Sequence, residues 1–438
     1  MKIGDWYQKR GLAFVFKRAK RLTARYSMTP HKAIMRISRC VEELSAQGCS
    51  PTFFVPAVVV GRNLQFLKVL QDCGCEIGVH GFQHVDLTSY PPAKSSEKLQ
   101  RAAEFLLMNG FKMEGFRCPY LSSSEALIRQ LPPRLFNYSS NRAIAWHTDG
   151  HGEAQERILY STIERFYHPL APNAHMRLPW LQDGMVEIPV CVPDDMQLYD
   201  GLNFSGEDIS AAWVNLLKET HRRGELFNLM FHPELSEFFE APFLEVLHAA
   251  RLLDGRVWVT RLQDVGRWWR KMSRFGVSFI KNGGTWHLQL SCDPQATILI
   301  RGLDLEVRSQ HWDGRYQRLP APDVQVHGGL LPFIGLAEDV PEWAGESLQR
   351  MGYIVLNGEE GRDCCTIIDR EFFTDLDNEV ALNRKIEQLE IPLIRYWPWP
   401  DGARSALCLS GDLDALSLMD YSTRLLPDWV FSKKAIAG

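Results

Sequence analysis

The sequence has no long run of apolar residues and no excess of basic charge. No stretch approaches the roughly 20 apolar residues of a membrane-spanning helix. The first apolar run, residues 12–16, is short and lies between basic residues, so we expect no signal peptide. A formal net charge of −4 over 438 residues gives no overall attraction to nucleic acid. These absences predict a cytoplasmic protein without a nucleic-acid partner.

The ten cysteines do not form the pattern of a disulfide framework or a zinc finger. Cys73 and Cys75 are one residue apart, and Cys364 and Cys365 are adjacent. Neither spacing is that of a zinc-finger pair. We therefore expect most cysteines to be buried free thiols in a reducing compartment. With 45% hydrophobic and 23% charged residues, the chain has an ordinary globular composition, and its length predicts two or three domains.

Residues 9–25 contain seven basic residues and no acidic one. Such a segment is typical of a solvated helix or a frayed terminus. The alternative is a peripheral contact with the anionic inner face of a membrane, in which case the protein could act as a membrane-surface scaffold.

Residues 30–272 alternate between helical and strand patterns. Strands are predicted at Thr52–Val55, Glu76–His80, Gly115–Arg117, Val186–Val190, Leu226–Phe231 and Val257–Val259. Helices are predicted at Ser95–Met108, with Ser96 as its cap, Glu207–Arg222, Leu244–Leu253 and Leu262–Met272. This alternation predicts an α/β fold with parallel strands, either a barrel or a doubly wound sheet. The unit begins with a further helix, in which Ala33, Ile34, Ile37, Val41 and Leu44 recur at helical spacing, so the strand that should precede this helix is missing.

The pattern changes after residue 274. Residues 275–345 show half-exposed strands separated by glycine turns and predict a small β-sandwich-like domain, either a sugar-binding module or a spacer. A predicted strand at 305–308 belongs to it. Residues 346–402 predict a short α/β segment. The last segment, 403–438, begins with an apolar strand, Ala406–Leu409, that has no partner nearby in the sequence.

Residues able to carry chemistry follow several predicted strands. His80 and His84 follow one strand, Arg117 and His232 end or follow two others, and Asp412-Leu413-Asp414 follows the last strand. Two imidazoles need a carboxylate to make a good metal site. Each motif alone also fits an ordinary core or turn residue. Together they lie at the carboxyl ends of parallel strands, where such folds build active sites.

These motifs resemble the polysaccharide deacetylases of carbohydrate esterase family 4. The matching segments are Pro51–Val55, His80-x-x-x-His84, Arg117-x-Pro119-Tyr120, Glu187-Ile188-Pro189 and Phe231-His232-Pro233. They occur in the order of the family and cover about residues 30–270. The resemblance implies a distorted (β/α)7-type barrel that hydrolyses N-acetyl groups of an amino-sugar-containing saccharide with a divalent metal ion.

One part of the family's pattern is out of place. The family begins with a strand that ends in an Asp pair, yet no aspartate lies between Asp5 and Asp72. The good match is Leu407–Asp414, near the other end of the chain. We predict a circularly permuted deacetylase whose first barrel strand is at the C-terminus. The alternatives are an Asp pair supplied by a second chain in a domain-swapped dimer, or a truncated second copy with an inactive site.

The resemblance also implies a role for individual residues. Asp414, His80 and His84 would hold the metal, with Zn²⁺ expected first and Co²⁺, Ni²⁺, Mn²⁺ or Fe²⁺ also compatible. Asp412 would be the general base, kept ionised by Arg117. The backbone N–H of Tyr120 would complete the oxyanion hole, and His232 would protonate the leaving amine.

The substrate is less defined by the sequence. Asp194 and Asp195 could contact sugar hydroxyls or cap the next segment, and Trp180 is a third candidate for substrate binding. For Trp397 and Trp399, core packing is favoured over stacking on a sugar. The saccharide could be a polysaccharide or a lipid-linked or nucleotide-linked sugar.

Two other functions remain open at this point. The first is a catalytically inactive carbohydrate-binding protein, in which Asp412 and Asp414 would lie far from His80 and His84. The second is a metal-dependent amidase that acts on a non-sugar amide.

Overall fold

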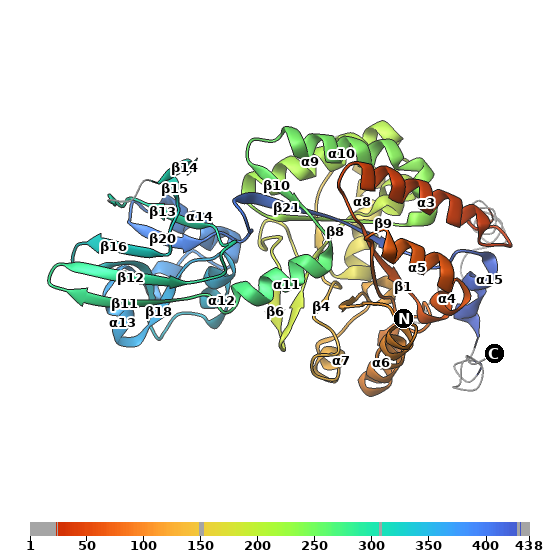
Figure 1. Ribbon diagram of the computed structural model, residues 1–438, viewed down its shortest axis with the longest axis horizontal. Helices are drawn as coiled ribbons and strands as arrows, with labels where there is room; N and C mark the ends of the chain where they lie inside the picture. Colours follow the sequence, from red (N-terminus) through yellow and green to blue (C-terminus); the bar gives the residue numbers. More distant parts are fainter. Residues whose placement is uncertain (1–22, 24, 149–152, 306–308, 427–429, 431–438) are drawn as a thin grey trace.

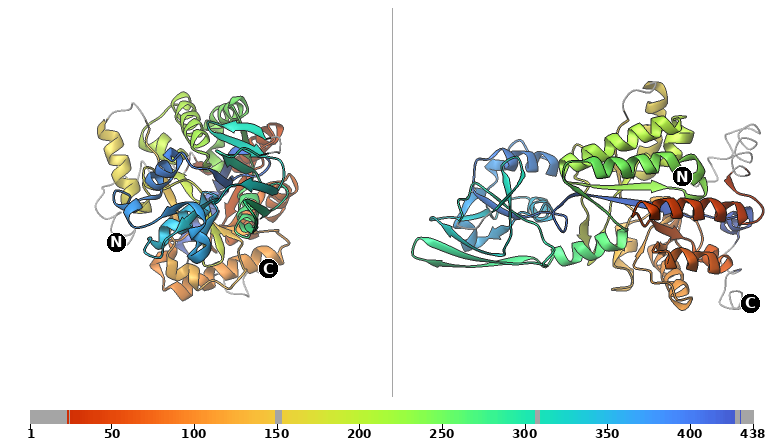
Figure 2. Two further views of the ribbon diagram at one scale, coloured as in Figure 1. Left: turned by 90° about the vertical axis from the view of Figure 1, so that its left-hand side faces the viewer. Right: turned by 45° about the horizontal axis from the view of Figure 1, so that its top comes forward.

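The computed structural model describes residues 23, 25–148, 153–305, 309–426 and 430. They form two lobes joined at a narrower waist (Figures 1 and 2). Most of the basic segment predicted at residues 9–25 lies outside the described residues. In the described ranges, no helix combines the length and apolar character needed to cross a bilayer. All ten cysteines are free thiols, as expected.

The larger lobe contains a curled 11-stranded sheet. Its main path runs β5-β8-β9-β21-β1-β2-β3-β4-β7-β6, and β10 pairs with β21. Every pairing in it is parallel except that of β6 with β7. The strands are β1 (Thr52–Val55), β2 (Glu76–Val79), β3 (Gly115–Phe116), β4 (Tyr138–Ser139), β5 (Ala143–Ala145), β6 (Trp180–Gln182), β7 (Met185–Glu187), β8 (Val190–Val192), β9 (Leu226–Phe231), β10 (Arg256–Val259) and β21 (Ala403–Asp412). The predicted α/β barrel is confirmed.

Helices cover the outer side of this sheet (Figure 1). They are α3 (His31–Ala46), α4 (Ala57–Arg62), α5 (Leu64–Asp72), α6 (Pro92–Met108), α7 (Glu125–Arg129), α8 (Glu153–Tyr167), α9 (Gly206–Arg223), α10 (Glu240–Leu252), α11 (Leu262–Met272) and α15 (Leu418–Ser422). Helix α9 begins with a capping box between Ser205 and Asp208. It ends at Gly224, whose φ of +71° favours glycine.

The predicted cap of α6, Ser96, is wrong. The helix begins at Pro92, three residues before the predicted start at Ser95, with Pro91 before it. Proline fits the first turn because the N–H that it lacks would be unpaired there in any case. The Ser96 hydroxyl instead donates to the Gln130 carbonyl, 2.8 Å away.

The single strand predicted at Val186–Val190 is two strands. Strand β7 pairs with β4, and β8 pairs with β5 and β9. Pro189 lies between them, and its missing N–H cannot take part in a continuous ladder. The sheet therefore continues in two directions from this point.

Strand β21 lies in the centre of the sheet, between β9 and β1 of the same chain. Ser410 is opposite Thr52, and Asp412 is opposite Phe54. On the other edge, Ala406 to Gly411 pair with the whole of β9. Gly411 allows this close approach, because a Cβ there would lie 2.6 Å from the Pro233 ring. The position between β9 and β1 is therefore taken by a strand that follows both of them in the sequence.

The smaller lobe contains three sheets built from residues 276–396. An antiparallel sheet joins β11 (Gly276–Asn282), β12 (Thr285–Ser291) and β16 (Asp323–His327). A second sheet has the order β14 (Gln310–Asp313), β15 (Tyr316–Leu319), β13 (Ile298–Arg301), β20 (Leu393–Tyr396). A parallel sheet, β18 (Val355–Asn357), β17 (Leu331–Leu336) and β19 (Cys364–Ile368), packs with α12 (Glu342–Arg350), α13 (Gly358–Arg362) and α14 (Glu379–Gln388).

The boundary predicted between residues 345 and 346 does not separate these sheets. Strand β13 pairs with β20, and β17 pairs with β18 and β19, so strands from both predicted segments mix. Three residues of the strand predicted at 305–308 lie outside the described residues. A common core also joins this lobe to the barrel, since Trp269 and Trp399 cluster with Ile334 and Leu348.

The interior position of β21 makes a stability prediction. Leu409 is 1% exposed in the barrel core, whereas Leu425, beyond the strand, is 80% exposed. We expect Leu409→Ala to lower the free energy of unfolding by about 2–5 kcal/mol, because it leaves a cavity in a packed core. Leu425→Ala, the matched control, should change it by less than about 0.5 kcal/mol. Urea unfolding followed by circular dichroism measures both, and equal midpoints for the two variants would contradict an interior β21.

Candidate metal centre and active site

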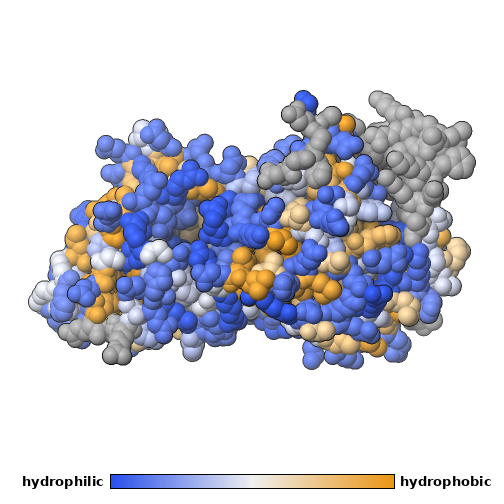
Figure 3. All heavy atoms as spheres, turned by 90° about the horizontal axis from the view of Figure 1, so that it is seen from above, coloured by the Kyte–Doolittle hydropathy of each residue, from blue (hydrophilic) through white to orange (hydrophobic). Residues whose placement is uncertain are grey.

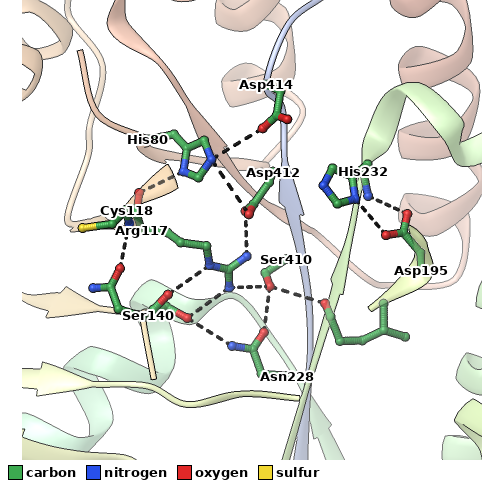
Figure 4. Close-up of polar contacts among 12 residues, drawn as sticks. His80, Arg117, Cys118, Ser140, Asp195, Asn228, His232, Ser410, Asp412 and Asp414 are labelled. Carbon is green, nitrogen blue, oxygen red and sulfur yellow. Dashed lines mark hydrogen bonds and ion pairs between the residues drawn. The ribbon is translucent and has the colours of Figure 1, made fainter. Parts of the chain in front are cut away.

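The residues that the sequence predicts to bind metal or act in catalysis lie together at the carboxyl ends of β2, β3, β9 and β21 (Figure 4). His80 follows β2, and Arg117 follows β3. His232 follows β9, and Asp412 is the last residue of β21. Strand β21 lies between β1 and β9. The carboxylates at its end therefore lie between His80, on the side of β1 and β2, and His232, on the side of β9.

His80, His84 and Asp414 form the tightest cluster. One ligand atom from each lies within 4.8 Å of the other two. His84 Nε2 is 3.0 Å from Asp414 Oδ1, and His80 Nε2 is 3.5 Å from the same oxygen. All three residues are buried. Burial lowers the pKa of His84 to about 4, so its imidazole is neutral at pH 7, as a metal ligand must be.

A backbone contact fixes which nitrogen of His80 is available. Its Nδ1 lies 2.8 Å from the Arg117 carbonyl, which can only accept, so Nδ1 carries the hydrogen. Nε2 then has a free lone pair, and it is buried without a hydrogen-bond partner among the described residues. Metal-bound histidines are commonly held in this way. The donor set therefore fits a divalent ion held by two imidazoles and one carboxylate.

Arg117 is fully buried and holds Asp412. Its Nη1 donates to Asp412 Oδ1 at 2.7 Å. Its Nη2 donates to the hydroxyls of Ser140 and Ser410, at 3.0 and 2.8 Å. Its Nε donates to the Ser140 carbonyl at 3.1 Å. A buried guanidinium needs such partners, and these contacts fix the direction of the Asp412 carboxylate. The sequence identified Arg117 and Asp412 but not the two serines.

His232 is held by Asp195. Its Nδ1 lies 2.8 Å from Asp195 Oδ1, and its backbone N–H donates to Oδ2 at 2.7 Å. Burial alone lowers the pKa of His232, but the Asp195 carboxylate outweighs this effect and the pKa rises to about 10. The imidazole is therefore cationic at neutral pH and can give up a proton.

The structure corrects the expected roles of Asp194 and Asp195. Asp195 is fully buried and contacts His232 rather than solvent, so it is not placed to bind a sugar hydroxyl. Asp194 accepts from the backbone N–H of Gln197 at 2.7 Å, which is the capping alternative. Burial and then the neighbouring Asp195 raise the pKa of Asp194 to about 7.

Trp180 is not brought to this cluster. It lies on β6 and lines a cavity of about 920 Å³ at the waist between the lobes, together with Trp343 and Arg350. The guanidinium of Arg350 lies 5.6 Å from the centre of the Trp180 ring. Trp399 is fully buried, as the core interpretation expected.

Tyr120 lies beside the metal cluster in an unusual backbone conformation. Its φ is +60°, and its ring is edge-on to His84 with 4.6 Å between ring centres. A chain of hydrogen bonds positions its loop. Glu187 accepts from the Asn141 backbone at 2.6 Å, and the Asn141 side chain accepts from the Cys118 backbone at 2.7 Å. The Glu187 motif therefore supports the loop that carries Tyr120.

Two residues from the N-terminal side were not expected at the site. Arg25 Nε and the Tyr26 hydroxyl donate to the same oxygen of Glu234, at 2.6 and 2.7 Å. Arg25 Nη2 also lies 3.7 Å from Asp414 Oδ2. Glu234 is fully buried and directly follows the predicted His232-Pro233 motif. The carboxylate of Glu234 was the one feature of the sequence from which a basic partner at this point could have been predicted.

The inactive-protein alternative expected the aspartates far from the histidines. Instead, His80 Nε2 lies 3.5 Å from Asp414 and 3.9 Å from Asp412. The specific geometry that this alternative required is therefore not observed.

Three solved structures illustrate the similarity found. A protein assigned as a polysaccharide deacetylase from Mycobacterium smegmatis is 21% identical, with a TM-score of 0.45 and coverage of 57% of this chain and 82% of that chain. A family 4 carbohydrate esterase from Streptomyces lividans is 15% identical, with a TM-score of 0.30 and coverage of 49% and 81%. PuuE allantoinase is 17% identical, with a TM-score of 0.41 and coverage of 54% and 72%.

The comparison with curated proteins gives no match. The family model for polysaccharide deacetylase matches residues 36–132. This segment includes β1, β2, β3 and four of the site residues, His80, His84, Arg117 and Tyr120. The resemblance inferred from the motifs is thus confirmed over the segment that the polysaccharide deacetylase model matches, residues 36–132.

Proposed function

We propose that the protein is a metal-dependent hydrolase that removes N-acetyl groups from an amino-sugar-containing saccharide. The observation that carries the proposal is the meeting of His80, His84 and Asp414 at one end of the sheet, with Asp412 and His232 beside them. The family match of residues 36–132 supports the same reaction class. The proposed saccharide is a polysaccharide, a lipid-linked sugar or a nucleotide-linked sugar.

His80, His84 and Asp414 would hold the ion. Zn²⁺ is the first choice for two imidazoles and one carboxylate, and Co²⁺, Ni²⁺, Mn²⁺ and Fe²⁺ accept the same ligands. Once bound, a divalent ion would lower the pKa of a water molecule and polarise the acetyl carbonyl.

Asp412 would accept the proton of the attacking water. Its Oδ1 is occupied by Arg117, and its Oδ2 lies on the side of His80 Nε2. The same carboxylate is thus fixed by one oxygen and directed toward the cluster by the other. A base held in this way does not have to reorient during the reaction.

His232 would donate the proton that the departing amine needs. An amine leaves as the free base only if it is protonated as the carbon–nitrogen bond breaks. The Asp195 carboxylate keeps His232 charged and fixes its Nδ1. Tyr120, at the edge of His84, would contribute its backbone N–H to the developing oxyanion.

The position of β21 supports interpreting this chain as a circularly permuted form of the family's barrel. On this interpretation, the Asp pair after β21 corresponds to the pair that opens the family's sequence. The pairing of β21 with β1 and β9 within one chain favours it over a domain-swapped arrangement.

Metal content separates the roles of the two aspartates. We expect the wild-type protein to bind about one divalent ion and His80→Ala and Asp414→Ala to lose it, because each removes one of three ligands. Asp412→Asn is the matched control, since it keeps the shape of the side chain and should retain the ion while losing acetate release. Mass spectrometry of the purified proteins for metals measures this. If Asp414→Ala keeps its full metal content, the proposed ligand set is wrong.

Acetate release from N-acetylglucosamine oligomers tests the reaction itself. We expect release that depends on added divalent metal and stops with chelator, because the ion is needed to activate water. Allantoin serves as the comparison substrate for an amidase acting on a non-sugar amide. Hydrolysis of allantoin without any acetate release would reject the deacetylase proposal.

The Asp195–His232 pair predicts a pH effect. His232 is protonated below its pKa of about 10, so activity should fall as the pH rises through that value. Asp195→Asn removes the negative charge that raises the pKa. The alkaline limb of the rate profile should then move to lower pH, and the rate at pH 8 should drop about 100-fold or more.

Asp194→Asn is the control for that substitution. An asparagine can still cap the Gln197 N–H, so the metal content should stay close to wild type, and the alkaline limb should move less than in Asp195→Asn because Asp194 raises the pKa of His232 less than Asp195 does. An unchanged alkaline limb in Asp195→Asn would show that His232 does not act as the acid.

A further inference from the structure

A second cavity lies at the opposite end of β21 from the proposed active site. It occupies about 500 Å³ between the C-terminal end of α9 and the sheet that contains β14, β15 and β20. Arg404, near the start of β21, lines this cavity, and Asp412 ends the strand. Eight residues of extended chain separate the two by roughly 26 Å. The cavity therefore does not belong to the metal cluster.

Positive charge dominates the lining of this cavity. Two acidic residues line it, Asp313 and Glu387, and six arginines do so: Arg222, Arg223, Arg315, Arg384, Arg395 and Arg404. The whole chain, in contrast, has a net charge of −4. Figure 3 shows strongly hydrophilic residues gathered at the waist, on the face that carries α9 and β14. Such an excess of guanidinium groups in a concave site favours an anionic ligand.

The protein itself does not neutralise all of these arginines. Arg404 pairs with Asp313 at 2.6 Å, and Arg395 pairs with Glu387 at 3.0 Å. Arg222 and Arg384 are exposed and form no ion pair among the residues that the structure describes. Both therefore remain available to a ligand.

Arg395 lines the cavity with a guanidinium group that the protein pairs only in part. Its side chain is 6% exposed, and its Nε is buried with no hydrogen-bond partner in the described part of the chain. Leaving a buried donor of a charged group unpaired is costly. Arg395 therefore adds a largely buried positive charge to the wall of the cavity, with one donor that the described chain leaves unpaired.

Aromatic rings form the rest of the wall. Trp312 and Trp397 lie edge to face, with 5.8 Å between ring centres, and Tyr316 lines the same cavity. Gly224 makes room for this wall, because a Cβ there would lie 2.4 Å from the Trp397 ring. Half-buried indole rings beside arginines provide an apolar face for a sugar ring next to donors for its charged group.

We propose that this cavity binds an anionic sugar, meaning a saccharide unit that carries a phosphate or a carboxylate. Guanidinium groups match both anions with paired hydrogen bonds, and the volume suits one or two sugar units. This site is separate from the proposed active site, and its occupation does not depend on catalysis. It would hold the charged part of a saccharide on the side of the barrel opposite the metal ligands.

Calorimetric titration of the full chain tests the proposal with defined probes. We expect glucose 1-phosphate or glucuronate to bind saturably and at least tenfold more tightly than inorganic phosphate, acetate or glucose. Tighter binding of the first probe would assign a phosphate-bearing ligand, and tighter binding of the second a carboxylate-bearing one. Affinity should fall as salt concentration rises. If inorganic phosphate binds as tightly as the two charged sugars, the aromatic wall does not contribute and the proposal is wrong. If glucose binds as tightly as they do, the arginines do not contribute and the proposal is equally wrong.

A double variant links binding to this cavity. Arg222→Gln/Arg384→Gln removes two exposed guanidinium groups without breaking an internal ion pair, so the fold should persist. We expect at least a tenfold loss of affinity. Arg39→Gln/Arg129→Gln removes two exposed arginines elsewhere and should change affinity less than twofold. The absence of saturable binding, or equal losses in the two double variants, would overturn the proposal.

Discussion

The structure depends on the parallel pairing of β21 with both of its neighbours. β9 and β1 flank β21 on its two edges, and neither is paired with the other. Without β21, the backbone groups on the facing edges of both strands would lack partners in the interior of the barrel. The same strand delivers Asp412 and Asp414 to the end of the sheet where the histidines lie. Stability and chemistry are thus linked through one ten-residue segment.

Buried charge is the second constraint. Arg117 is enclosed entirely, and the surrounding chain provides an acceptor for each of its three nitrogens. The acceptors lie on β21 and on Ser140, which directly follows β4, and Arg117 itself follows β3, so the guanidinium joins β3, β4 and β21 at one point. This arrangement explains why an arginine is compatible with the core here. It also explains how Asp412 is kept in one orientation beside the imidazole of His80.

Much of the site followed from the sequence because strand ends are visible as patterns. The apolar runs before His80, His232 and Asp412 predicted strands, and parallel strands bring their carboxyl ends together. The partnership of Asp195 with His232 did not follow. It depends on β8 lying beside β9, and the strand predicted at Val186–Val190 shared only Val190 with β8.

Other differences have a similar origin. Trp180 was grouped with the site by its position in the sequence, but an antiparallel turn onto β6 takes it to the waist. The boundary expected near residue 345 failed because β13 finds its partner β20 about 95 residues later. Local patterns indicate where a strand is, whereas its neighbour is selected by long-range packing. Arg25 and Tyr26 also reach the site only through the tertiary fold.

The central place of β21 has a consequence for synthesis on the ribosome. The chain is made from its N-terminus, so β1 and β9 exist long before the strand that must separate them. During that interval, the unpaired edges of β1 and β9 can pair with each other or with a strand of another chain. The smaller lobe, made just before β21, shares a core with the barrel and can hold the two halves in place until the last strand arrives. Asp412 and Asp414 can meet His80 and His84 only after β21 has been made, although the two histidines precede that strand by more than 300 residues.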